Sequence, residues 1–70
     1  MRTARETPLE MARRHVREGE ARVQRQRSLV IQLQRLDDAL HTEGQRLLAI
    51  LEDALKLHKA RLAHLEAEGR

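Results

Sequence analysis

The residues best equipped for chemistry in this 70-residue chain are its four histidines. His15 is followed three positions later by Glu18, which places an imidazole and a carboxylate on one face of a helix. Two such pairs, brought together by a dimer axis, would offer the nitrogen and oxygen ligands that helical bundles use for metal ions. We favour the alternative, a solvated histidine within a ladder of charged side chains. His41 and His64 join no such cluster.

His58 lies near the centre of the apolar arc of the second predicted helix, where we expect it to face Val23, Gln26 and Arg27. One reading is a pH-sensitive or ligand-binding imidazole. The other is a buried polar residue that fixes the register of two helices through a hydrogen bond with Gln26. We favour the second reading.

Arginines concentrate in residues 11–35, which hold seven of them against two glutamates. A basic helix of this kind can bind phosphates, and the candidate contacts are Arg13, Arg14, Arg17 and Arg25. These side chains are spread around the helix, however, and Glu10–Arg14 has the spacing of a stabilising ion pair. The chain also has no aromatic residue to stack on a base. A solvated helix face is therefore the preferred interpretation.

Nothing in the sequence has the pattern of an enzyme. There is no cysteine, which excludes disulfides and cysteine-ligated metals, and Ser28 is the only serine. No glycine-rich phosphate loop is present. We therefore expect no catalytic residue, no cofactor and no dedicated metal ligand.

Two helix start signals organise the chain as one domain. Thr7, Pro8 and Glu10 have the spacing of a capping box with proline at the first helical position. Thr42 and Gln45 repeat the box, so one helix is predicted over about 8–40 and a second over about 43–68, with 1–6 as a flexible tail. So short a connection predicts an all-α antiparallel hairpin.

The second helix carries more apolar surface than one neighbour covers. One stripe, Leu48–Leu51–Leu55–His58–Leu62–Leu65, has the 3-4 spacing of a helix–helix seam, and a second stripe of Leu47, Ile50, Ala54 and Leu57 lies beside it. Folding about residues 41–42 also leaves residues 8–16 overhanging. We therefore predict a homodimer that forms a four-helix bundle, with an interface containing Leu9, Met11, Val16, Val23, Val30, Leu33, Leu47, Leu48, Leu51, Leu55, His58, Leu62 and Leu65.

The stretch from Arg14 to Val23, with its His-Val-x-x-Gly-Glu-x-Arg-Val pattern, resembles one in short bacterial helical proteins of similar length, as does the segment from Leu47 to Glu66. The resemblance implies a small helical protein and no activity.

No apolar run approaches the ~20 residues that span a bilayer, and no secretory signal follows Met1, so we expect a cytoplasmic protein without membrane contact. The predicted function is a non-enzymatic self-association and protein–protein interaction module, acting as a small adaptor or regulator. The alternatives are a nucleic-acid-associated protein and, third, a metal-binding bundle.

Overall fold

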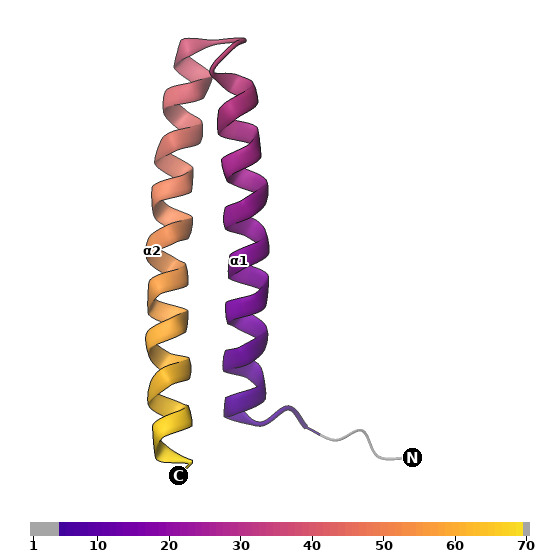
Figure 1. Ribbon diagram of the computed structural model, residues 1–70, viewed down its shortest axis with the longest axis vertical. Coiled ribbons are helices and arrows are strands. Elements are labelled where there is room, and N and C mark those ends of the chain that lie inside the picture. The colour runs from indigo at the N-terminus through magenta and orange to yellow at the C-terminus, as the bar shows by residue number, and fades with distance from the viewer. Residues whose placement is uncertain (1–4, 70) are drawn as a thin grey trace.

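The computed structural model, which describes residues 5–69, is a hairpin of two helices and contains no strand in that range. Helix α1 (Pro8–Leu33) and helix α2 (Asp38–Glu68) run antiparallel, side by side along their length (Figure 1). The predicted all-α hairpin is confirmed.

The start of α1 follows the predicted capping box. The hydroxyl oxygen of Thr7 accepts a hydrogen bond from the Glu10 amide at 3.0 Å, and the Thr7 amide donates to the Glu10 carboxylate at 2.9 Å. Pro8 occupies the first turn, where a missing amide proton costs nothing. Two of the amide groups that a helix leaves unsatisfied at its start are therefore paired.

The start of α2 differs from the prediction. Helix α1 ends at Leu33 and α2 begins at Asp38, so the boundaries predicted near 40 and 43 are wrong. Asp37 is the capping residue, and its carboxylate accepts from the Leu40 amide at 3.0 Å. Thr42 lies inside the helix, where its hydroxyl donates to the Asp38 carbonyl at 3.1 Å. A carboxylate cap, with Asp38 also in the first turn, suits the positive end of the helix dipole.

Because the turn falls near residue 35 rather than 41, α2 covers the whole of α1. Ala12 and Val16, which were predicted to overhang, are buried. Arg13 reaches Glu66 near the far end of α2, with 4.0 Å between the charged atoms. The predicted overhang is therefore wrong.

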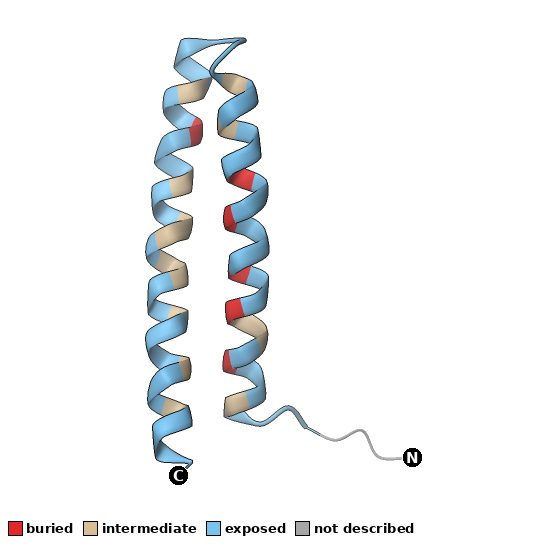
Figure 2. Cartoon of the chain, viewed as in Figure 1, coloured by how far each residue is buried: buried red, intermediate tan, exposed pale blue. Residues whose placement is uncertain are grey.

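The buried and half-buried residues lie along a narrow seam where the two helices face each other (Figure 2). Its leucines on α2, including Leu48, Leu51 and Leu55, are half-buried, and no large side chain among the described residues is fully buried. The buried residues repeat at three- and four-residue steps on α1 and meet a single buried residue on α2: Ala12, Val16, Gly19, Val23 and Gln26, with Gly44 opposite. The hairpin thus has one layer of contact rather than a filled core.

Two glycines let the helices approach closely. A Cβ atom at Gly19 would lie 3.1 Å from a methyl of Leu55, and one at Gly44 would lie 3.2 Å from a methyl of Leu33 and 3.4 Å from one of Val30. Beside Gly44 the buried amide of Gln26 donates a hydrogen bond to the Gly44 carbonyl at 2.9 Å. This bond between the helices specifies their register, because a slip would leave a buried amide unpaired.

Candidate functional site

Ion pairs between the two helices line one long edge of the hairpin, which we call the charged flank. Arg27 pairs with Glu52 at 3.1 Å and Arg13 with Glu66 at 4.0 Å. Glu20 on α1 and Lys59 on α2 lie halfway between these pairs, seven residues along the helix from each paired residue. Every residue of this flank immediately follows a seam residue in the sequence.

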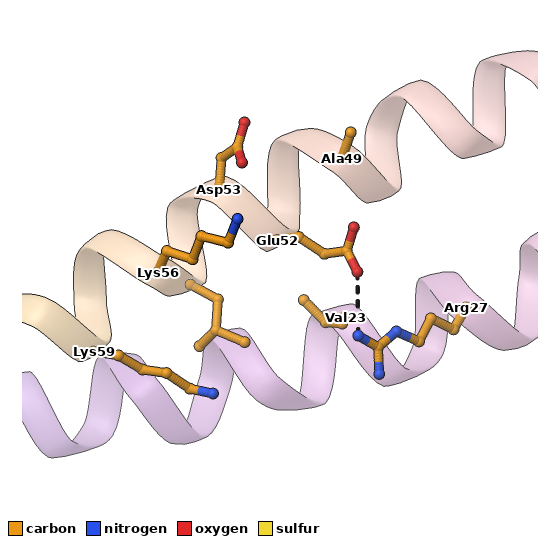
Figure 3. A pocket seen from close by; sticks show the side chains of 8 residues that line it. Val23, Arg27, Ala49, Glu52, Asp53, Lys56 and Lys59 are labelled. Carbon is orange, nitrogen blue, oxygen red and sulfur yellow. Dashed lines mark hydrogen bonds and ion pairs between the residues drawn. The ribbon is translucent and has the colours of Figure 1, made fainter.

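The charged flank contains an open hollow of about 310 Å³. Figure 3 shows Arg27 reaching across to Glu52, with Asp53, Lys56 and Lys59 around the opening. The lining therefore carries both carboxylates and cationic groups, of which Arg27 and Glu52 form an ion pair. The hollow has neither a histidine nor a hydroxyl nucleophile in its lining.

The opposite edge carries large exposed apolar side chains, mostly from α2, and its location follows from helix geometry. In an α-helix the residues before and after a seam position point to opposite sides, about 100° each way. The ion pairs show that residues following seam positions share one flank, so residues preceding seam positions share the other. We call the large apolar side chains of this edge the apolar flank: Leu29 on α1 and, on α2, Leu40, Leu47, Ile50 and Leu57, all between 42% and 73% exposed. Charged residues share the edge, because Glu18, Arg22 and Arg25 precede seam residues on α1 and Glu43 precedes Gly44 on α2.

Most residues predicted for a dimer interface are used within the hairpin itself. Val16 and Val23 are buried in its seam, so they are covered without a second copy. Nine of the others are half-buried, eight leucines or valines and one histidine: Leu9, Val30, Leu33, Leu48, Leu51, Leu55, Leu62 and Leu65 with His58. Only Met11 and Leu47 of the predicted set are exposed. The contribution of these residues to a dimer stays a prediction.

His58 has different neighbours from those predicted. Its ring lies beside that of His15 across the seam, with 5.2 Å between ring centroids and 52° between planes. Its Cδ2 atom is also near Gly19. The predicted hydrogen bond with Gln26 is wrong, because the earlier turn brings His58 about two helical turns closer to the start of α1. The pairing with His15 has no signal in the spacing along either helix and depends on register alone.

The candidate phosphate-binding arginines are partly engaged by carboxylates. Arg14 donates to Glu6 at 2.9 and 3.0 Å and to Glu18 at 3.1 Å, rather than pairing with Glu10. The Arg14 hydrogen bonds lower the pKa of Glu6, and the same contacts raise the pKa of Arg14. Arg13 faces Glu66, whereas Arg17 and Arg25 form no ion pair within residues 5–69.

The disfavoured alternative for His15 and Glu18, a metal site between two copies of the chain, stays a hypothesis, because one hairpin supplies only one such pair. The Glu18 carboxylate accepts from Arg14, and His15 faces the other helix. Among the described residues, no three or more histidine, cysteine, aspartate or glutamate side chains gather as ligands for one ion.

No protein family, curated protein or solved structure matches the chain. The resemblance to short bacterial helical proteins therefore stays a prediction. Neither α1 nor α2, in the part of the chain described, is long and apolar enough to cross a membrane.

Proposed function

We propose that the chain is a non-enzymatic self-association module in which two hairpins pair through their apolar flanks into a four-helix bundle. The observation that carries this proposal is the row of five large apolar side chains left in water along one edge. Soluble monomers rarely expose a contiguous patch of this kind unless it binds something.

The shortage of burial within the hairpin supports the same proposal. Within residues 5–69, only Ala12, Val16 and Val23 form a buried apolar core. The chain exposes 5892 Å², whereas a compact monomer of its mass exposes about 4,500 Å². This surplus exceeds the ~800 Å² that each partner buries in an ordinary interface.

The shape and composition of the flank favour a second copy as its partner. From Leu40 to Leu57 the strip covers about 26 Å of α2, long enough for several layers of helix packing. On α2 the one charged side chain at positions that precede seam residues, before Arg61, is Glu43. A two-fold axis would place this strip against itself, which matches leucines with leucines and needs no second protein.

Support for the nucleic-acid hypothesis is weaker. Two of the four candidate arginines already face carboxylates. Arg13 faces Glu66 on α2. Arg14 pairs with Glu6, which precedes α1, and with Glu18 on α1. A phosphate would have to compete for these guanidinium groups.

Two isoleucines provide a matched test of the proposal. Ile50 on the apolar flank is 63% exposed, and Ile31 on the other side of the hairpin is 64% exposed. Lysine at either position is compatible with a solvated helix surface. We expect Ile50→Lys to reduce the molar mass measured by light scattering from dimer to monomer, while Ile31→Lys leaves it unchanged. Equal effects of the two substitutions, or a monomeric parent, would overturn the proposal.

A further inference from the structure

The apolar strip on α2 has a spacing that reads the same in both directions. Its members are separated by seven, three and seven residues: Leu40, Leu47, Ile50 and Leu57. A two-fold axis that crosses α2 at right angles through the midpoint of the strip therefore sets Leu40 on the partner's Leu57, and Leu47 on the partner's Ile50. The same axis sets Glu43 opposite the partner's Ala54, whose small side chain leaves the carboxylate access to water. The two copies of α2 then run antiparallel.

This axis passes through α1 close to Arg25. A Cβ atom at Gly19 would lie 3.1 Å from Leu55, and one at Gly44 would lie 3.4 Å from Val30. These two contacts show which residues of the antiparallel helices are level with each other, and both helices rise by about 1.5 Å per residue. The midpoint of the strip is therefore level with residues 25–26, and the axis packs α1 against the partner's α1 at that height.

Two arginines of α1 gather at the axis. Arg22 and Arg25 share the edge of the apolar flank, both are exposed, and neither forms an ion pair within residues 5–69. Along the helix both lie within about 5 Å of the axis. Helix α1 has no carboxylate between Ala21 and Leu33, and Glu18 accepts from Arg14 at 3.1 Å. Two copies thus bring four guanidinium groups together without a carboxylate from the adjoining part of α1.

The other possible axis, parallel to the helices, is disfavoured by the same arginines. It would set the apolar strip against the partner's α1, so that leucines would cover Arg22 and Arg25, and a charge buried without a partner is costly. The perpendicular axis sets Leu29 on the partner's Arg22 instead, because the two residues are equally far from the axis. The aliphatic stem of the arginine can lie on the leucine while its guanidinium group stays in water.

We propose that the dimer axis carries an anion site, formed by Arg22 and Arg25 of both copies, for a chain of two or more phosphate groups. The site rests on the self-association proposed above, because one hairpin supplies only half of the guanidinium groups. Guanidinium groups bind phosphate oxygens through paired, charge-assisted hydrogen bonds. A phosphate chain can reach groups on both copies at once. By offsetting the repulsion between like charges, the bound anion tightens the dimer.

The test is calorimetric titration of the full chain with tripolyphosphate, together with sedimentation equilibrium with and without it. We expect one tripolyphosphate per two chains and a dimer dissociation constant that falls about tenfold. Sodium chloride at the same ionic strength should do much less, because screening does not bridge the two copies. Adenosine triphosphate without magnesium should bind as well as tripolyphosphate, since the chain has no aromatic residue to stack on a base. Tighter binding of adenosine triphosphate would support the site with a nucleotide as its ligand.

Two arginines provide matched variants, because glutamine is as good a helix former as arginine. Arg25→Gln should abolish the binding of one tripolyphosphate per two chains. Without added anion it should also tighten the dimer, because two of the four like charges at the axis are gone. Arg17→Gln, which removes an exposed and unpaired arginine from the other side of α1, should change neither property.

The molar mass separates failure of this site from failure of the proposed dimer. A dimer that binds no tripolyphosphate, or binds one per chain, overturns the site and leaves the self-association standing. Binding that survives Arg25→Gln does the same. A parent chain that stays monomeric with and without tripolyphosphate overturns both proposals.

Discussion

The two seam glycines, though both helical and both opposite leucines, should respond differently to alanine. At either site alanine gains about 1 kcal/mol of helix propensity over glycine. At Gly19 the added methyl would meet one tight neighbour, the end of the Leu55 side chain, with its next contacts at 3.9 Å. A leucine methyl can move by a few tenths of an ångström, so Gly19→Ala should be neutral or slightly stabilising.

At Gly44 the added methyl would be enclosed on three sides. It would lie 3.2 Å from Leu33, 3.4 Å from Val30 and 3.6 Å from the Gln26 amide, which must also keep its bond to the Gly44 carbonyl. Overpacking of this kind costs about 1–3 kcal/mol. After the gain in helix propensity, Gly44→Ala should lower the free energy of unfolding by up to about 2 kcal/mol relative to the parent.

Urea denaturation followed by circular dichroism, at one fixed protein concentration, measures the difference between the two variants. The concentration must be fixed because association shifts the apparent stability. If Gly44→Ala proves as stable as Gly19→Ala, the helices do not approach at Gly44 as closely as described, and the proposed role of the Gln26 bond in the register fails with it.

Two further predictions concern the ends of the helices. Asp37→Ala should lower the free energy of unfolding by about 1 kcal/mol, because the helix cap is lost, whereas Thr42→Ala should change it very little. Urea denaturation measures both. If Thr42→Ala proves the more destabilising of the two, α2 begins where the sequence predicted. The second prediction concerns the pH dependence of stability. Hydrogen bonds from the backbone amide and the side chain of Thr7 lower the pKa of Glu10, and hydrogen bonds from Arg14 lower the pKa of Glu6. Because a lowered carboxyl pKa stabilises the fold only above its unfolded value, this stability is present near neutral pH and is lost as pH falls through the folded pKa. Glu10→Gln should therefore reduce the fall in the free energy of unfolding between neutral and acidic pH. If that fall is unchanged, the capping box does not form.

The hairpin, its first cap and the second apolar stripe were predictable because each follows from local spacing. Thr7 and Glu10 specify a helix start without help from the rest of the chain. Leu47, Ile50 and Leu57 precede seam residues at regular intervals, so their common flank can be read directly from the sequence.

The position of the turn was not predictable in the same way. Leu36 and Leu40 continue the three- and four-residue steps of α1 past its real end, and Thr42 with Gln45 imitates a cap. Because the apolar positions repeat about every seven residues, one helix can shift along the other by one repeat and still place apolar residues opposite each other. The choice between such registers depends on contacts between the helices, namely the Gln26–Gly44 bond and the charged flank, and sequence spacing does not reveal these.

The missed pairing of His15 with His58 has the same cause. Each residue is visible in the sequence, yet their meeting depends on the turn at 34–37 and on the space that Gly19 leaves. An error of two helical turns in register was enough to assign His58 the wrong neighbours.

The most direct test of the proposed self-association is the molar mass of the parent chain by sedimentation equilibrium across the micromolar range. The chain has a mass of 8.2 kDa. The apolar flank predicts a species of twice that mass, with a melting temperature that rises with protein concentration. A chain that stays at 8.2 kDa throughout, fully helical and cooperatively folded, would contradict the proposal that the apolar flank is a dimer interface.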